Sequence, residues 1–304
     1  MAKRVARRES QLVLGLDPDP AALWPDGGQG AVAPGSAPAQ TAAAAVRAHC
    51  CALIDATAHA CVAVKLQLAR FELLGEAGRG ALGAVAAHAR EAGLLVIADA
   101  KRGDIDVTAQ AYASSLFGGV DTPFGHVEGL GADMATVNPL MGADALAPFV
   151  STARAGGAGV LVLVRTSNPG AADVEDLRVE GSGTVWERIA AIVEEQGRPG
   201  VGESGLSDVG AVVGATEPRH LARARELMPH TTFLLPGVGA QGGRVEELAP
   251  AFAPGRAGGL VSASRSIADA YRKAGGEPAS AAREEAERLR EAAWALSERA
   301  LAAG

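Results

Sequence analysis

Short apolar runs alternate with longer amphipathic stretches along most of this 304-residue chain. The runs are apolar throughout, which is typical of strands that are buried on both faces of a parallel sheet. Eight such runs predict strands at residues 12–16, 61–66, 94–98, 134–137, 160–164, 209–215, 232–235 and 259–263.

The stretches between these runs are compatible with helices. Eight strand–helix units in a chain of this length favour a closed (β/α)8 TIM barrel over an open, doubly wound sheet. The helices are expected at residues 41–57, 76–92, 105–116, 143–155, 184–195, 218–227, 244–252 and 266–273.

Three segments interrupt this alternation. Residues 18–40 and 117–131 are long for connections without structure of their own, so each is expected to be a lid or another excursion from the barrel. Residues 277–303 mix Glu and Arg with Ala and Leu, which predicts an amphipathic final helix on the outside of the barrel. We therefore treat residues 1–304 as a single barrel domain with a C-terminal helical extension at about 277–303.

The composition limits what this barrel can bind. Hydrophobic residues make up 48% of the chain but aromatic residues only 4%, so the core must be built from Ala, Val and Leu. Lys and Arg total 28 against 35 Asp and Glu, and this net charge of −7 argues against a nucleic-acid-binding or anionic-membrane surface. An anionic ligand must therefore be held by a local group of donors.

The cysteines and the N-terminal region indicate the cytoplasm. Cys50, Cys51 and Cys61 are too few and wrongly spaced for a zinc site, and an odd number suits a reducing compartment. The basic residues at 3–8 are followed by only about six apolar-leaning residues, whereas a secretory signal needs about 7–15. No apolar run approaches the length of a membrane span, so we expect no membrane partner.

Polar residues gather where the predicted strands end. Because barrels carry their active sites at the C-terminal face, these side chains predict one shared pocket. They are Asp17, Lys65, Asp99, Lys101, Asn138, Thr166, Ser167, Gln241 and Arg265.

The stretch 99–104 brings opposite charges together. Asp99 and Lys101 lie two residues apart on one strand, so their side chains point to the same face. Asp104 follows at the turn, and Thr108 lies one helical turn later. A second carboxylate and a hydroxyl therefore face outward from the start of the next helix.

The segment 236–243 has the composition of an anion-binding loop. It reads Pro-Gly-Val-Gly-Ala-Gln-Gly-Gly, and glycine lets consecutive N–H groups converge on a ligand because it has no Cβ. Arg265, at the start of the helix after the last strand, adds a guanidinium that can grip phosphate through two parallel hydrogen bonds. Together they predict a phosphate site after the last two strands, where barrels often carry one.

In combination, these motifs resemble the orotidine 5′-phosphate decarboxylase family, specifically its longer bacterial subfamily. The resemblance runs from about residue 12 to residue 271 in the same order. The matching segments are 98–105 for the catalytic loop, 64–67 for the lysine strand, 166–170 for the turn that contacts the pyrimidine, and 236–243 with 264–266 for the phosphate.

The resemblance implies that an alternating tetrad of charges forms the catalytic group, namely Lys65, Asp99, Lys101 and Asp104. It also implies a homodimer with shared active sites, in which Asp104 and two residues near it belong to the neighbouring subunit's site. Those two residues are Ile105 and Thr108.

The other implied roles concern the substrate, orotidine 5′-phosphate. Asp17 would bind the ribose hydroxyls together with Lys65, and Ser167 would contact the pyrimidine amide. Gln241 would bridge the base and the phosphate, which Arg265 would hold. Ser264 departs from the family, because many relatives have glycine there. The whole predicted substrate-binding set is Asp17, Ile105, Thr108, Asn138, Ser167, Pro236, Gly237, Gln241, Ser264 and Arg265.

The implied reaction is the loss of CO₂ from C6 of the pyrimidine, which leaves UMP in de novo pyrimidine biosynthesis. It uses no metal or other cofactor, so Lys101 is expected to stabilise the C6 carbanion and then to protonate it.

Two other interpretations stay open. A sugar-phosphate decarboxylase of the same superfamily shares the Asp-x-Lys-x-x-Asp spacing but needs a divalent metal, and Ser167 with Gln241 favours a nucleotide instead. A non-catalytic barrel that binds a nucleotide or serves as a scaffold predicts loss of at least one charge of the tetrad, whereas all four are present.

Overall fold

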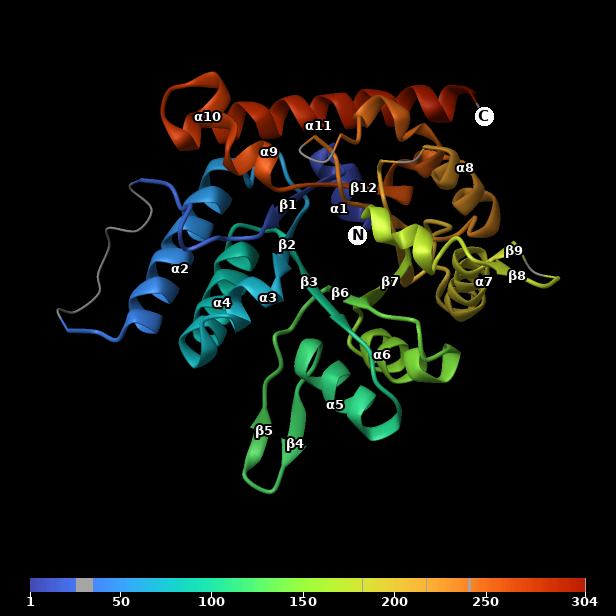
Figure 1. Ribbon diagram of the computed structural model, residues 1–304, viewed down its shortest axis with the longest axis horizontal. Helices are drawn as coiled ribbons and strands as arrows, with labels where there is room; N and C mark the ends of the chain where they lie inside the picture. The colour runs from blue at the N-terminus through green and yellow to red at the C-terminus, as the bar shows by residue number, and fades with distance from the viewer. Residues whose placement is uncertain (26–34, 182, 217, 240–241, 304) are drawn as a thin grey trace.

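The computed structural model describes residues 1–25, 35–181, 183–216, 218–239 and 242–303, and a closed barrel of parallel strands lies at its centre (Figure 1). The barrel strands are β1 (Leu12–Leu16), β2 (Ala63–Gln67), β3 (Leu95–Arg102), β6 (Met134–Val137), β7 (Gly159–Arg165), β10 (Val209–Val213), β11 (Phe233–Leu235) and β12 (Gly259–Ala263). They follow the order β1-β12-β11-β10-β7-β6-β3-β2 around the barrel. Each corresponds to one predicted apolar run, so the (β/α)8 TIM barrel is confirmed.

Successive side chains of a strand point to opposite sides of the barrel wall. On β1, Leu12, Leu14 and Leu16 pack with the surrounding helices, whereas Val13 packs with inward-facing residues of other strands. The inner face changes from apolar to polar toward the C-terminal ends of four strands. The changes run from Ala63 to Lys65, from Ile97 to Asp99, from Met134 to Thr136 and from Leu260 to Ser262.

Helices surround the barrel, and small side chains let them pack closely on it. Ala282, Ala286 and Ala293 are buried on the last helix, which contacts the barrel at β1 and runs along one side of the molecule. This helix corresponds to the predicted C-terminal one. The longer helices are α2 (Pro38–Thr57), α4 (Gly75–Glu91), α5 (Asp106–Leu116), α6 (Ala143–Ala155), α7 (Val185–Gly197), α8 (Pro218–Leu227) and α11 (Pro278–Ala303).

One of the predicted helices is wrong and another is divided into two. Residues 244–252 form the 3₁₀ turns η3 (Val245–Glu247) and η4 (Ala249–Phe252), and Pro250 within them has no N–H for a helical bond. Residues 266–273 are divided between α9 (Arg265–Ala268) and α10 (Ala270–Ala274). At this break the carbonyl of Ala268 accepts a hydrogen bond from Nε1 of Trp24 at 2.8 Å.

Arg225, on α8, holds the segment that replaces the first of these helices. Its buried guanidinium donates to the carbonyls of Ala251 at 2.9 Å and Gly258 at 3.0 Å, and it lies 3.8 Å from the centre of the Phe233 ring. Burial lowers the pKa of Arg225 to about 9. Such a group satisfies carbonyls that an irregular segment cannot pair within itself.

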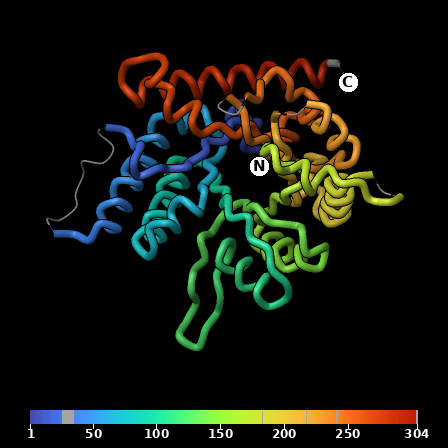
Figure 2. Tube along the Cα trace, in the orientation of Figure 1, coloured from blue at the N-terminus to red at the C-terminus, as the bar shows by residue number. Residues whose placement is uncertain are grey.

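The two predicted interruptions contain ordered structure. Trp24 is buried with its ring edge-on to that of His49, at a centroid distance of 5.4 Å, while residues 26–34 lie outside the described residues. In residues 117–131, β4 (Val120–Thr122) and β5 (Gly125–Val127) form an antiparallel hairpin. Figure 2 shows this hairpin extending away from the barrel.

Several short elements have no counterpart among the predictions. At the N-terminus, Arg8 donates to the carbonyls of Cys61 at 2.9 Å and Gly93 at 3.1 Å, so it joins the first helix to the segments that precede β2 and β3. No described helix is both long and apolar enough to cross a membrane. The added elements are α1 (Ala2–Arg8), α3 (Leu68–Glu72), η1 (Pro169–Asp173), β8 (Arg178–Val179), β9 (Gly183–Thr184), η2 (Arg198–Gly200) and η5 (Arg256–Gly258).

Helix α4 gives a test of this packing because it contains glycines in opposite environments. A Cβ at Gly80 or Gly83 would meet no atom within 4 Å, so Gly80→Ala and Gly83→Ala should each raise the free energy of unfolding by about 0.5–1 kcal/mol. A Cβ at Gly78 would lie 1.9 Å from the carbonyl oxygen of Phe71, so Gly78→Ala should lower it. Urea unfolding measures all three, and equal effects at the three positions would contradict the packing.

Candidate active site

A cavity of about 410 Å³ opens at the polar, C-terminal end of the barrel. This volume lies in the usual range for small-molecule sites. The cavity brings together nine of the predicted site residues: Asp17, Lys65, Asp99, Lys101, Ser167, Pro236, Gly237, Ser264 and Arg265. Gln241 lies outside the described residues.

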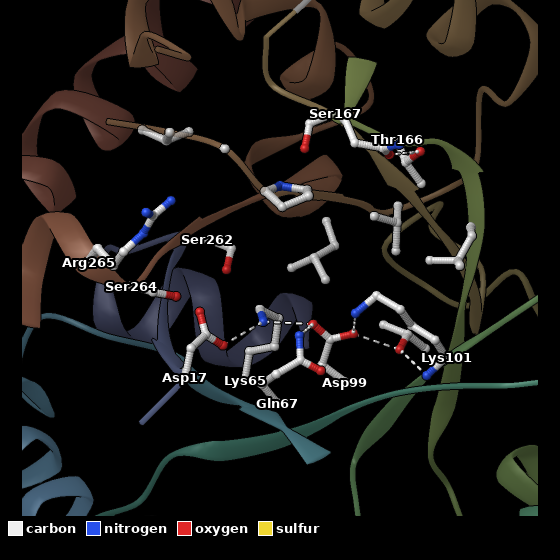
Figure 3. A pocket seen from close by; sticks show the side chains of 18 residues that line it. Asp17, Lys65, Gln67, Asp99, Lys101, Thr166, Ser167, Ser262, Ser264 and Arg265 are labelled. Atoms are coloured by element: carbon white, nitrogen blue, oxygen red, sulfur yellow. Dashed lines mark hydrogen bonds and ion pairs between the residues drawn. The ribbon is translucent and has the colours of Figure 1, made fainter. Parts of the chain in front are cut away.

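Figure 3 shows that alternating charges form a row along one wall of the cavity. The row contains Asp17, Lys65, Asp99 and Lys101. Ser264 and Arg265 lie near the Asp17 end of this row, and Ser167 lies across the cavity from it (Figure 3). The cavity therefore has a cationic end, a charged wall and a hydroxyl opposite that wall.

Asp99 is the best-bonded member of the row. Its Oδ2 accepts hydrogen bonds from Nζ of Lys65 at 2.7 Å and from Nε2 of Gln67 at 3.3 Å. Its Oδ1 accepts from Nζ of Lys101 at 2.5 Å and from Oγ1 of Thr136 at 2.9 Å. These four donors use both oxygens, so the carboxylate has one well-defined orientation.

Burial and neighbouring charges shift the pKa values of Asp99 and Lys65 in opposite directions. Burial alone would raise the pKa of Asp99, but the charges of Lys65 and Lys101 and their hydrogen bonds outweigh it and lower the pKa to about 2. Burial alone would likewise lower the pKa of Lys65, but Asp99 and Asp17 outweigh it and raise that pKa. Both side chains are therefore ionised at neutral pH.

Lys101 differs from Lys65 in its exposure. The Lys65 side chain is only 7% exposed and also forms an ion pair with Asp17 at 3.6 Å, whereas the Lys101 side chain is 46% exposed. Lys101 also has a φ of 49°, in the left-handed region that non-glycine residues seldom adopt. Of the two ammonium groups, that of Lys101 is the freer to meet a bound molecule.

The turn after β7 carries Ser167, and hydrogen bonds to two carboxylates later in the chain hold it in place. Glu175 accepts hydrogen bonds from the N–H and from Oγ1 of Thr166, both at 2.9 Å. Arg165 forms two hydrogen bonds with Asp176, at 2.9 and 3.0 Å. Carboxylates nine and eleven residues along the chain thus position the turn that presents Ser167.

Glycines make room for two of the serines that line the cavity. A Cβ on Gly214 would lie 2.9 Å from Cα of Ser167, and one on Gly15 would lie 1.8 Å from Oγ of Ser264. Ser264 therefore fits here because the neighbouring strand carries glycine at position 15. Gly237, at the cationic end, has a φ of 102°, a conformation that favours glycine.

Asn138 is not among the residues that line this cavity. Strand β6 ends at Val137, and Asn138 is exposed with its Oδ1 accepting the N–H of Leu140 at 3.0 Å. Thr136, two residues earlier, faces the cavity instead. The side chain of Asn138 stabilises a local turn because the chain leaves the barrel wall before reaching it.

The other three predicted residues lie beyond this cavity. Asp104 is partly exposed in the loop after β3, and its Oδ1 accepts the N–H of Ile105 at 2.8 Å. Ile105 is 55% exposed, and Thr108 is exposed on the first turns of α5. None of the three lines the cavity of the barrel that carries them.

Three polar strand residues that line the cavity were missing from the predicted set: Gln67, Thr136 and Ser262. Each is a polar residue in or at the end of an otherwise apolar strand, and each continues the inward-facing period of its strand. That period was the signal that could have found them. Among the described residues, no group of three or more His, Cys, Asp or Glu side chains is placed to hold a metal ion.

Comparisons with known proteins agree on one family. Residues 10–284 match the model of the "Orotidine 5'-phosphate decarboxylase / HUMPS family". The chain is 43% identical to orotidine 5′-phosphate decarboxylase of Rhodopirellula baltica, over 76% of this chain and 75% of that protein. It is 45% identical to the Deinococcus radiodurans protein of the same name, over 79% and 81% respectively. The Leishmania donovani OMP decarboxylase structure is similar at a TM-score of 0.71 and 32% identity, covering 98% of each chain.

The low pKa of Asp99 predicts a specific loss of stability in acid. A native pKa of about 2, below the ordinary 3.8, means that the native state binds fewer protons than the unfolded state between these values. This contribution, about 2 kcal/mol, is present above about pH 4 and is lost as the pH falls toward 2. The gap in unfolding free energy between wild type and Asp99→Asn should therefore narrow over that range.

Urea unfolding at several pH values between 7 and 2.5 measures this gap. The control is Asp173→Asn, at an exposed carboxylate, which should change the unfolding free energy by less than about 0.5 kcal/mol at neutral pH. If the difference in unfolding free energy between wild type and Asp99→Asn stayed constant down to pH 2.5, the low pKa of Asp99 would be ruled out.

Proposed function

The chain belongs to the orotidine 5′-phosphate decarboxylase / HUMPS family, and on this premise we propose that it converts orotidine 5′-phosphate to UMP and CO₂. The observation that carries the proposal is the row of alternating charges, which has the cationic end of the cavity at one of its ends and faces Ser167 across the cavity. We place the reaction in de novo pyrimidine biosynthesis in the cytoplasm.

The proposed substrate has three parts that correspond to three parts of the cavity. Its phosphate would lie at Arg265 and the Gly237 loop, and its ribose hydroxyls would meet Asp17 and Lys65. The amide edge of the pyrimidine would face Ser167, on the side opposite the row. This orientation directs C6 and its carboxylate toward Asp99 and Lys101.

The proposed chemistry breaks the bond between C6 and the carboxylate carbon. CO₂ leaves, the electron pair remains on C6, and Nζ of Lys101 supplies the proton that forms the C6–H bond. Lys101 is suited to this role because its half-exposed side chain lines the cavity while its Nζ lies 2.5 Å from Asp99. The attraction between a cation and a developing carbanion is stronger in a water-poor site than in bulk water.

Repulsion between Asp99 and the substrate carboxylate would be a smaller effect. Two like charges about 4 Å apart at an effective dielectric of about 20 repel by roughly 4 kcal/mol. Enzymes commonly lower reaction barriers by about 8–23 kcal/mol. We therefore assign the larger share of the barrier lowering to stabilisation of the carbanion by Lys101, together with phosphate binding energy that holds the reacting geometry.

A metal-dependent sugar-phosphate decarboxylase is the alternative within this family. Purified protein should consume orotidine 5′-phosphate, followed by its absorbance, in the presence of a chelator. Activity that disappears with the chelator and returns with a divalent metal would favour the alternative. Ser167 favours the nucleotide, because its hydroxyl lies across the cavity from the charged row, where we place the pyrimidine amide.

We infer that the protein acts as a homodimer through the face that carries Asp104. Among the described residues, eight of the fourteen exposed large hydrophobic side chains fall between residues 105 and 141. This face includes α5, the β4–β5 hairpin and the loop after β6, and Phe124 at the hairpin is 99% exposed. Exposed apolar surface of this kind is typical of protein interfaces. The eight are Ile105, Val107, Tyr112, Val120, Phe124, Val127, Leu140 and Met141.

Such a dimer would complete both sites. Asp104 begins this face, so a two-fold axis near it would bring each Asp104 toward the partner's cavity along with Ile105 and Thr108. Each site would then hold Lys65, Asp99 and Lys101 from one subunit and Asp104 from the other.

Lys101→Ala should reduce turnover of orotidine 5′-phosphate by at least about 10³-fold, because it removes both the countercharge and the proton donor. UMP binding, measured by calorimetry, should persist, since the phosphate and pyrimidine contacts remain. Lys273→Ala, at an exposed lysine on α10, is the control and should leave turnover unchanged. Near-normal turnover in Lys101→Ala would remove this lysine from the mechanism.

Mixing Lys101→Ala with Asp104→Ala tests the shared site. If subunits pair randomly, about half of the dimers are hybrids, and each hybrid has one site with all four charges. Activity should therefore return to about a quarter of the wild-type value after refolding together. Mixing Lys101→Ala with Asp99→Asn is the matched control, because both changes affect groups of the same barrel and no hybrid site is intact. If activity recovered in neither mixture, although subunit exchange had been verified, the shared active site would be refuted.

A further inference from the structure

The pairing of β3 with β6 is interrupted beside the charged row. Ala98 pairs with Ala135, and the next pair is Arg102 with Val137. Three residues of β3, from Asp99 to Lys101, therefore stand opposite Thr136 alone. A bulge of this kind leaves backbone groups without their regular ladder partners and redirects side chains.

Thr136 supplies the contacts that the ladder lacks. Its hydroxyl accepts a hydrogen bond from the backbone N–H of Lys101 at 2.9 Å and donates one to Oδ1 of Asp99, also at 2.9 Å. The residue is only 1% exposed. Because a hydroxyl has a single hydrogen and an N–H can only donate, both bonds form at once only in this arrangement.

The backbone of Lys101 needs such support. Its φ of 49° lies in the left-handed region, which a non-glycine residue keeps only where the surroundings hold it. In this conformation its ammonium reaches Oδ1 of Asp99, the same oxygen that Thr136 contacts. One buried hydroxyl therefore restrains both the backbone of the lysine and the carboxylate beside it.

The geometry points to Thr136 as a positioning residue that holds Lys101 and Asp99 in register for the reaction. This inference rests on the proposed function for its kinetic consequence, although the contacts themselves do not depend on it. Thr136 would act through its hydrogen bonds to Lys101 and Asp99. Its effect is to keep Nζ of Lys101 at one place in the cavity while the substrate carboxylate leaves.

Three variants separate positioning from a structural role. Thr136→Val keeps the shape but removes the hydroxyl, so kcat should fall about 10–100-fold while KM changes less than about 3-fold. Thr136→Ser keeps the hydroxyl and should recover kcat to within about 3-fold of wild type. Thr57→Val is the matched control, because it removes another buried hydroxyl, which donates to the carbonyl of Leu53 at 2.8 Å in α2. It should lower thermal stability and leave kcat unchanged.

A second measurement does not require activity. Acetylation of Lys101 by a limiting amount of acetic anhydride, followed by mass spectrometry, reports how well its ammonium is held beside Asp99. The rate should rise at least about 3-fold in Thr136→Val and stay at the wild-type value in Thr136→Ser and Thr57→Val.

The outcomes are distinct. A wild-type protein that does not consume orotidine 5′-phosphate would refute the proposed function, and the acetylation rates would then decide the role of Thr136 alone. A folded Thr136→Val with wild-type kcat and an unchanged Lys101 acetylation rate would overturn the inference. Equal loss of kcat in Thr136→Val and Thr136→Ser would also overturn it, because the hydroxyl would then not be the group that matters.

Discussion

A carboxylate that is only 6% exposed stays ionised in a barrel interior when cations and donors surround it, and Asp99 meets this condition. Lys65 and Lys101 approach it from opposite sides, and each is held there by the charge that it neutralises. Removing Asp99 would leave the buried ammonium of Lys65 with only its longer ion pair to Asp17. The parts of β2, β3 and β6 that carry Lys65, Asp99 and Thr136 therefore depend on one another, although they are far apart in the chain.

The barrel separates the stability of its core from the chemistry of its cavity. At the N-terminal end of the strands the inward positions are apolar, as Ala63 and Ile97 show, and two residues later they carry the charges of Lys65 and Asp99. A core built mostly from small side chains allows close approach of strands and helices. Gly15 and Gly214 extend the same principle to the cavity, where they leave space for Ser264 and Ser167.

Irregular backbone is concentrated next to the charged row. The β3–β6 ladder breaks after Ala98, and Lys101 adopts a left-handed conformation just before the strand ends. A regular strand would continue the ladder and leave no place for the Thr136 hydroxyl between Asp99 and Lys101. Departures from regular geometry at such a place accompany function when the surroundings stabilise them, as two hydrogen bonds of Thr136 do here.

Local patterns in the sequence determined the eight strands, most of the helices and the cluster around Asp99, because burial periodicity and strand-end chemistry are properties of neighbouring residues. Only the tertiary structure decided that Thr136 rather than Asn138 faces the cavity, since the end of β6 depends on its pairing with a bulged β3. It likewise decided against a helix at residues 244–252, where Arg225 of α8 binds the carbonyl of Ala251. Both outcomes depend on partners more than twenty residues away in the chain, whose position no local pattern specifies.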